Sequence, residues 1–343
     1  MRPVLTPSAR RLWRDRHTLQ FGNRALLVGV DEPTRATLAL LDGTRDRAQV
    51  LAAAEHVGCP APRANDLLDL LARDGLLEDA GGDQSVLGAL ARTERERLAP
   101  DLGSLSLVRH DGGLPAAEHR RAARVLVVGG GRVGAPLAAL LAAAGVLVVD
   151  VHDGHLASAQ DCGVGGLGLT DIGRGRGVAA RQRIAALAPS AAAGTGTGAS
   201  PDLVVLAPSR PVELEVALER LDPGTPYLLA QVRDTVGVVG PLVLPGRTAC
   251  LRCCELTRTD LDPGWPALSA QLACPTQHRE ACDGPLAVMV AAQAALQVLL
   301  LIDGTADPAA LGGTLELALP DWRWRRRSWP PHPACGCGAS SDP

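Results

Sequence analysis

Four cysteines in two close pairs are the residues of this chain with the clearest chemistry. Cys250 and Cys253 form a C-x-x-C, and Cys335 and Cys337 form a C-x-C. Each pair can supply two thiolates from one turn, and four thiolates suit a closed tetrahedral zinc site of the structural kind. The long separation between the pairs raises the entropic cost of loop closure only logarithmically. We therefore predict a four-cysteine zinc site that ties the C-terminal tail to the rest of its domain.

A second candidate site is the glycine-rich stretch 129–134, which reads GGGRVG. An apolar run from Val125 to Val128 precedes it, a helical run follows to Ala144, and a second apolar run ends at Asp150. This order of strand, glycine turn, helix and strand with an acid at its tip is typical of a Rossmann-type nucleotide site. The helix N-terminus would offer free N–H groups to a phosphate.

Each conspicuous residue of this stretch has an expected task. Gly129 would permit the tight turn, Gly131 would let the backbone approach a phosphate, and Gly134 would let the helix lie against the sheet. Asp150 falls at the distance where a carboxylate would meet a ribose. We predict these four residues as cofactor-binding; the alternative is a Rossmann-like sheet whose nucleotide site is vestigial.

Of the remaining cysteines, Cys274 and Cys282 flank His278. A cysteine near a histidine can act as a nucleophile, although loop cysteines without a role are the plainer interpretation. No catalytic residue is assigned. Three further cysteines carry no partner signal in the sequence: Cys59, Cys162 and Cys254.

Composition limits the classes of function. The formal net charge is −3 and no lysine occurs among the basic residues, which argues against a general nucleic-acid binder. Hydrophobic residues make up 46% and aromatic residues only 2%, so the core must consist mainly of Ala, Leu and Val. The N-terminus lacks an apolar signal core, so we expect a cytoplasmic protein whose cysteines are ligands or free thiols.

The length of 343 residues suggests two or three domains. In the second part of the chain, strands alternate with helices, which predicts a parallel, doubly wound α/β sheet. The expected elements are helices Val178–Leu187 and Val212–Leu221 and strands Asp202–Leu206, Tyr227–Val232 and Thr314–Leu319, the last continuing through Asp321–Arg325. An apolar helix over 284–301 contains Gln293 and Gln297, so we expect it on the sheet or at a homodimer interface, with no span of a membrane.

Residues 1–85 predict a small winged-helix-like α+β domain, followed by a linker over 86–122 and the Rossmann-type domain over 123–343. Two short strands lie within Gln20–Val30, and three helices follow, the last over Pro62–Asp74. DNA binding is one use of such a module, but the third helix has only two arginines against three aspartates. Capture of an extended peptide by strand addition is another use.

The stretches LWRDRHTLQFG, LLDGTRDRAQVLAAA and LLDLLARDGLLED of this segment resemble the precursor-recognition module of ribosomal peptide biosynthesis. In that family the module captures a leader peptide as an added strand between its third helix and its sheet. The resemblance implies a groove here over Arg63 to Leu77.

The region from Arg124 to Cys337 resembles the ThiF-like adenylyltransferases of the ubiquitin-activating-enzyme superfamily. The matching features are the glycine turn, Asp150 and Asp153, the stretch Asp171-Ile172-Gly173-Arg174, Asp202-Leu203-Val204, and both cysteine pairs. The resemblance implies ATP and magnesium, and activation of a carboxylate as an acyl-adenylate.

The chain departs from that family at the charged residues. Cys162 stands where the family has an arginine that meets the phosphates, and Arg176 stands in place of its phosphate-binding lysine, although Arg176 remains a predicted cofactor-binding residue. The family's acidic motif is replaced by Leu206-Ala207-Pro208-Ser209-Arg210, which has no carboxylate. Losing such charges removes the usual stabilisation of phosphoryl transfer.

The whole arrangement resembles the leader-peptide-binding proteins of azole/azoline-modified peptide (TOMM) pathways. There such a protein presents the precursor to a separate, ATP-using YcaO-type cyclodehydratase, and we expect the same here without adenylation by this chain. Two alternatives stay open: an ATP-dependent adenylyltransferase for a ubiquitin-like or sulfur-carrier protein, and a winged-helix DNA-binding regulator.

Overall fold

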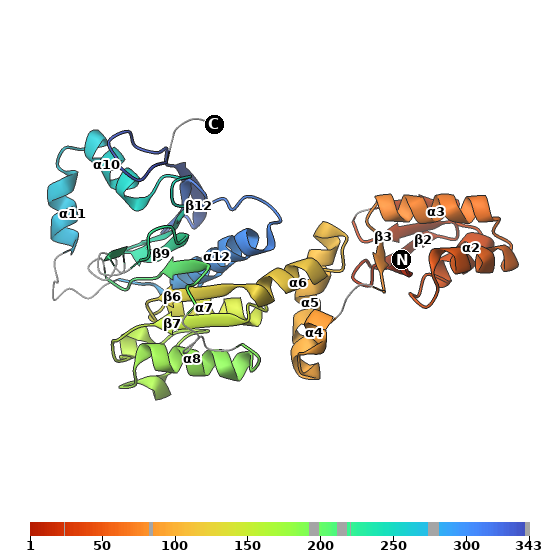
Figure 1. Cartoon of the computed structure of the whole chain (residues 1–343), viewed down its shortest axis with the longest axis horizontal. Coiled ribbons are helices and arrows are strands. Elements are labelled where there is room, and N and C mark those ends of the chain that lie inside the picture. The colour runs from red at the N-terminus through yellow and green to blue at the C-terminus, as the bar shows by residue number, and fades with distance from the viewer. Residues whose placement is uncertain are drawn as a thin grey trace. The chain divides into compact units, whose positions relative to one another are not determined.

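The computed structural model describes residues 1–23, 25–81, 85–191, 199–210, 218–219, 221–273 and 281–339. The chain divides into two compact units, 1–118 and 119–343 (Figure 1). Each unit has its own hydrophobic core, so each can be understood by itself.

Two small sheets and three helices form most of the N-terminal unit. Strands β2 (Arg11–Asp15), β3 (Thr18–Phe21) and β4 (Ala25–Val28) make an antiparallel sheet in that order, and β1 (Pro3–Leu5) pairs with β5 (Leu77–Asp79). The helices are α1 (Glu32–Ala39), α2 (Arg47–His56) and α3 (Ala61–Arg73). Their apolar faces meet one face of the sheet in a core that includes Leu19, Phe21, Leu68 and Leu71.

Local signals explain where these helices begin and end. The Asp31 side chain accepts the N–H of Thr34 at the start of α1, and Asp46 makes a capping box with Gln49 at the start of α2. Gly58 and Gly75, which follow α2 and α3, have φ of 83° and 66°, a backbone region that favours glycine. The three predicted helices are therefore present, and α3 lies within one residue of its predicted bounds, Pro62–Asp74.

Much of the predicted linker is helical. It contains α4 (Ser85–Gly88), α5 (Arg92–Arg109) and α6 (Leu114–Ala122). Helix α5 belongs to the N-terminal unit, because Leu107 packs against the first core and the Ser106 hydroxyl donates to the Glu78 carboxylate. The predicted division at residues 85 and 122 stays a prediction.

The C-terminal unit is built on a seven-stranded sheet of order β12-β11-β10-β9-β8-β6-β7. Four strands are mutually parallel, as predicted, whereas the pairs from β9 to β12 are antiparallel. The strands are β6 (Arg124–Val128), β7 (Val148–His152), β8 (Leu203–Leu206), β9 (Tyr227–Arg233), β10 (Val236–Val243), β11 (Gly313–Ala318) and β12 (Arg323–Ser328).

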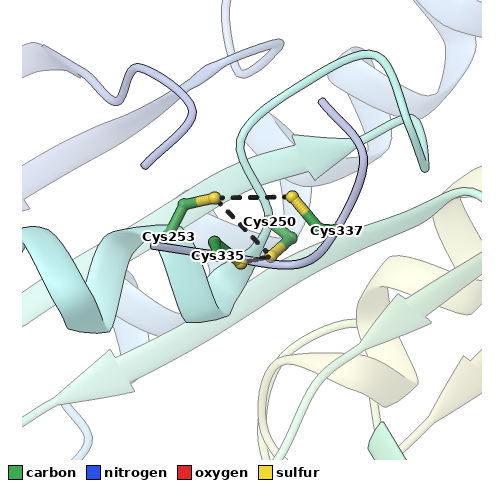
Figure 2. Close-up of side chains that lie close together, drawn as sticks. All are labelled: Cys250, Cys253, Cys335 and Cys337. Carbon is green, nitrogen blue, oxygen red and sulfur yellow. Dashed lines mark hydrogen bonds between the residues drawn. The ribbon is translucent and has the colours of Figure 1, made fainter. Parts of the chain in front are cut away.

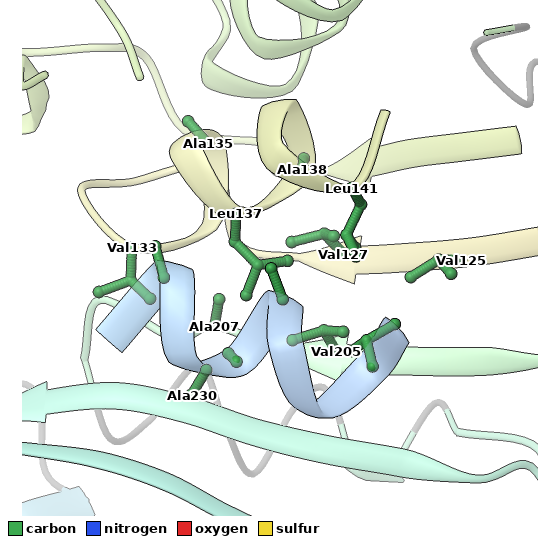
Figure 3. Close-up of a cluster of buried hydrophobic side chains, with 14 of the residues drawn as sticks. Val125, Val127, Val133, Ala135, Leu137, Ala138, Leu141, Val205, Ala207 and Ala230 are labelled. Atoms are coloured by element: carbon green, nitrogen blue, oxygen red, sulfur yellow. The ribbon is translucent and has the colours of Figure 1, made fainter. Parts of the chain in front are cut away.

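Helices α7 (Gly134–Ala143), α8 (Arg176–Leu187) and α12 (Gly284–Asp303) cover one face of this sheet. Their small and aliphatic side chains form the main core, in which Leu137 points from α7 toward the blue helix α12 (Figure 3). The opposite face packs against Leu218, Leu221 and the start of α10 (Leu251–Leu261), which α11 (Trp265–Ala273) follows. Alanine, leucine and valine supply nearly all of both cores, as the composition predicted.

The sheet contains one strand that was not predicted and contradicts one expectation. Strand β10 was not predicted; Arg233 pairs with Val236, and the intervening two-residue turn is too short for the crossover that a parallel strand needs. The chain also turns back after β11 rather than continuing through Asp321–Arg325, so β12 is a separate edge strand, with Trp324 against the core. The predicted helix Val212–Leu221 lies mostly outside the described residues.

Helix α12 is, among the described residues, the one helix whose length and apolar composition would also suit a membrane span. It packs against β9, β10 and α7, and 44% of its apolar window is buried. Core helices commonly share these properties, and the helix lies on the sheet as predicted. Its most exposed apolar side chains are those of Met289 and Leu296, and a homodimer interface there stays a prediction.

One buried ion pair joins α6 to the end of α12. Arg120 Nε lies 2.8 Å from Asp303 Oδ1, and Arg120 Nη2 lies 2.6 Å from Oδ2; the two side chains are 7% and 3% exposed. Arg120 Nη1 also donates to the carbonyl of Ala144 at 2.9 Å.

We expect Asp303→Asn to lower the free energy of unfolding by about 3–5 kcal/mol, since it leaves a buried guanidinium without its countercharge. Chemical denaturation followed by circular dichroism measures this loss. The control Asp321→Asn weakens an exposed pair with Arg325 in the same unit and should leave the unfolding midpoint unchanged. Equal effects of the two substitutions would contradict the expectation.

Candidate functional site

The four predicted zinc ligands lie together (Figure 2). Their sulfur atoms are all within 4.8 Å of one another, with 3.8 Å between Cys250 and Cys253, and 3.6 Å for each of the pairs Cys250–Cys335 and Cys253–Cys337. Tetrahedral thiolates at about 2.3 Å from zinc would be roughly 3.8 Å apart. The cluster therefore has the size and donor set of a structural metal site, and the predicted grouping is confirmed.

Other contacts hold the C-terminal tail beside α10. His332 Nε2 lies 2.8 Å from Asp260 Oδ2, and the N–H of Cys335 donates to the carbonyl of His332. The Trp329 ring is 4% exposed, and the Arg258 guanidinium lies 5.0 Å from its centroid. These contacts orient the second cysteine pair independently of a metal.

Among the described residues, the other cysteines do not belong to this group of four sulfur atoms. Cys254 is 1% exposed, and burial raises the pKa of its thiol to about 12, so it is a neutral core residue. Burial also raises the pKa of Cys282, while the nearby charge of Arg132 acts in the opposite direction. Cys274 and His278 lie outside the described residues, so the proposed nucleophile stays a prediction.

The glycine turn brings strands β6 and β8 and helix α7 into close backbone contact. Gly129 has φ of 106°, and a methyl group on it would lie 2.1 Å from the carbonyl oxygen of Ala207. A methyl group on Gly134 would lie 1.9 Å from the carbonyl oxygen of Gly129. The turn and the close helix packing expected of these glycines therefore both require the absence of a side chain.

Asp150 in β7 and Asp153 just after it have different surroundings. Asp150 lies within the strand, where its carboxylate contacts His152 Nε2 at 3.1 Å and Arg181 Nη1 at 3.4 Å. Asp153 lies just beyond the strand and accepts the N–H of Gly130 at 2.8 Å. The contacts favour Asp153 over Asp150 as the carboxylate of this site, and Asp150 as a ribose ligand stays a prediction.

Asp153 is also bound to its other neighbours. Burial alone would raise its pKa, but hydrogen bonds from the N–H groups of Gly130 and His155, with the charge of Arg176, lower the pKa below the usual value. His155 Nδ1 lies 3.0 Å from Asp153, and His155 Nε2 lies 3.1 Å from Arg210 Nη2. Because a guanidinium only donates, Nε2 accepts and the Nδ1 proton faces Asp153.

Arg176, the predicted substitute for a phosphate-binding lysine, is the first residue of α8 and is turned toward acids of this chain. Its Nη2 lies 2.7 Å from Asp161 Oδ1, and its Nη1 lies 3.6 Å from Asp153 Oδ2 and 3.5 Å from Ser209 Oγ. The sequence did not indicate that Arg176 pairs with Asp161, because the two residues lie in separate segments that meet only in the folded chain.

The two other departures from the expected charges lie nearby. The carbonyl of Cys162, which stands in place of an arginine, is 3.4 Å from Arg132 Nη2, and the thiol lies 3.2 Å from the carbonyl of Gly168. After β8 the chain places Ser209 beside Arg176 and Arg210 beside His155. At these positions, where the family that the sequence resembles has phosphate or metal ligands, the residues of this chain contact other groups of the protein.

The N-terminal unit offers a second candidate surface on its three-stranded sheet. The outer face carries Leu12, Gln20 and Leu26 in one row across the strands, and Thr18 and Val28 in the next. Leu12, Leu26 and Val28 are 50%, 48% and 68% exposed. The predicted groove over Arg63–Leu77 has a different character, because Leu67, Leu68 and Leu71 of α3 are buried and Arg63 pairs with Asp31 at 2.7 Å.

We expect the purified chain to carry about one zinc ion, which Cys253→Ser should remove together with at least about 3 kcal/mol of stability, since structural zinc contributes to folding directly. Elemental analysis and thermal unfolding measure the two effects. Cys254→Ser is the matched control, because it alters the adjacent buried thiol outside the cluster. Full zinc content in Cys253→Ser would contradict the assignment.

Comparison with known proteins identifies the fold of the chain and its family. Crystal structures of E. coli MccB with ATP and of the microcin C7 biosynthetic enzyme MccB with N-formylated MccA each match at a TM-score of 0.71 and 14% identity, over 98–99% of this chain and 99–100% of theirs. PaaA matches at 0.68 and 19% identity, over 94% of this chain and 98% of its own. At these identities the likeness establishes the fold alone, and no curated protein sequence matches. The ThiF family matches residues 102–339, and the predicted α/β fold is thereby confirmed: the chain belongs to the ThiF family.

Proposed function

We propose that this ThiF-family protein captures the leader segment of a ribosomally made precursor peptide and presents it to a separate YcaO-type cyclodehydratase, without adenylating a substrate itself. The observation that carries the proposal is the exposed, uncharged edge strand β4 in the N-terminal unit. The solved complex of MccB with the peptide MccA, which has the same fold, supports peptide binding as a use of this architecture.

Strand β4 differs from the opposite edge of its sheet. Its four residues, Ala25–Val28, carry no charge, whereas β2 contains Arg11, Arg14 and Asp15. Exposed edge strands are normally protected by charges, because their free N–H and C=O groups recruit other strands. An unprotected β4 is therefore the better place for a peptide to add a strand, with Leu26 and Val28 receiving its side chains.

The charges that the C-terminal unit lacks support the proposal that a separate enzyme carries out the ATP-dependent step. Phosphoryl transfer needs cations and metal-binding acids to stabilise charge at the phosphate. Here Arg176 is paired with acids of the protein, and residues 207–210 contain no carboxylate. A protein of this kind would leave the ATP-dependent step to another enzyme, with the zinc cluster holding its own tail in place.

Leu26→Asp should weaken binding of the leader peptide at least about tenfold, because a charge enters the apolar contact beside the added strand. Fluorescence anisotropy with labelled synthetic peptides, copied from short reading frames beside the gene, measures the affinity. Leu12→Asp is the matched control, since it lies in the same row on the opposite edge. If no such peptide binds the wild-type chain, or both variants bind alike, the proposal fails.

Adenylation of a carrier protein is the second candidate function, and membership of the ThiF family favours it. We expect no exchange of labelled pyrophosphate into ATP, whether ubiquitin-like carriers or leader peptides are present, because the charges that stabilise the transition state are missing. An active ThiF-family enzyme assayed in parallel provides the control. Exchange above the protein-free rate would favour the second candidate.

DNA binding has less support than either. Both arginines of α3 are paired with acids, Arg63 with Asp31 and Arg73 with Asp74, and the helix also carries Asp66 and Asp69. A helix that approaches phosphates would be expected to carry excess positive charge.

A further inference from the structure

The Asp161 carboxylate lies beside the glycine turn, near the place where the backbone of the turn could approach a phosphate. A methyl group built on Gly131 would lie 2.5 Å from Ser209 Oγ and 4.0 Å from Asp161 Oδ1. Gly131 is the glycine that in a Rossmann-type site allows close approach of an anion. Here the Ser209 hydroxyl makes that close approach, and the Asp161 carboxylate lies beside it.

We propose that Asp161 is an internal substitute for a nucleotide phosphate, so that this ThiF-family site excludes nucleoside triphosphates rather than binding them without turnover. ATP and magnesium, which the family implies, do not fit the residues present. The inference concerns nucleotide binding by the C-terminal unit, and it can fail or succeed independently of peptide capture by the N-terminal unit.

The Asp161 carboxylate is fixed by its own turn. Its Oδ2 accepts the N–H and the hydroxyl of Ser158, each at 2.8 Å, as the cap of the 3-10 turn Ala159–Asp161. This leaves Oδ1 to Arg176 at 2.7 Å, and the residue is only 7% exposed. A carboxylate held in this way at both oxygens is a permanent part of the site.

The charges of the site then oppose an incoming phosphate. Arg176 lies between Asp161 and Asp153, so its single positive charge faces two carboxylates. A triphosphate would bring further negative charge toward Asp161 in a partly buried setting, where charges are weakly screened. The replacement of metal-binding acids by residues 207–210 removes the ion that could otherwise offset this repulsion.

Two arginine nitrogen atoms of the site could nevertheless donate hydrogen bonds to an anion. Among the described residues, Arg132 Nε and Arg176 Nε are buried without a hydrogen-bond partner. Buried polar atoms of this kind are rare and call for an explanation. Removing the charge of Asp161 should therefore uncover a site with cationic donors, which predicts a gain of nucleotide binding.

Asp171 provides a closely matched control. It also ends a 3-10 turn, Leu169–Asp171, accepts the N–H of Gly168 at 2.9 Å, and is 5% exposed. Its ion pairs are with Arg174 at 3.2 Å and Arg183 at 3.3 Å, rather than with Arg176. Asp171→Asn thus removes a similar capping charge away from the glycine turn.

The test titrates ATP, with magnesium and with a chelator, and inorganic triphosphate into the full-length wild type, Asp161→Asn and Asp171→Asn by isothermal calorimetry. We expect no saturable binding to the wild type or to Asp171→Asn, and saturable binding to Asp161→Asn with a dissociation constant at least about tenfold below the highest ligand concentration tested. Thermal unfolding should show comparable losses of stability for the two variants.

Saturable binding of ATP to the wild type at micromolar concentration would overturn the inference. So would an Asp161→Asn variant that binds no better than the wild type, or an equal gain in Asp171→Asn, which would indicate general loosening. Leader-peptide binding measured on the same three proteins should be identical, so a failure of peptide capture is distinguishable from a failure here.

Discussion

The close approach of α7 to the end of β6 is the constraint on which the C-terminal unit depends. Gly134 packs against the carbonyl of Gly129, and Gly129 packs against the carbonyl of Ala207, with no room for a side chain at either glycine. Backbone contact among β6, α7 and the end of β8 brings Asp153, Arg176 and Ser209 to one place. The same constraint holds whatever charges surround the turn, which explains how a nucleotide-type fold can keep its shape after its charges change.

The changed charges form a connected set rather than scattered losses. Arg176 bridges Asp161 and Asp153, Asp153 continues to His155, and His155 meets Arg210. The charged side chains of this region are therefore paired with one another within the protein. The four-cysteine cluster and the Arg120–Asp303 pair join segments that are far apart in the sequence and stabilise the unit around these residues.

Residues that act locally could be predicted from the sequence, whereas contacts between loops could not. Asp31, Asp46 and the glycines after α2 and α3 determine helix ends through neighbours within a few positions. The cysteine pairs were recognisable because zinc restricts both donor type and spacing. Strand β10 was missed because its short hairpin lacks the usual Asn-Gly or Asp-Gly signal. The contacts that distinguish Asp153 from Asp150, and the pair Asp161–Arg176, exist only after three separate segments have folded together.

The cysteine cluster joins residues 85 and 84 positions apart in sequence. Everything between them, including α11, α12 and the β11–β12 hairpin, belongs to a loop that this cluster closes. During translation the cluster cannot form until residue 337 has left the ribosomal exit tunnel, by which time β6 to β9 have long been exposed. The four-cysteine cluster is therefore one of the last parts of this unit that can assemble, after strands β6 to β9 are already available for pairing.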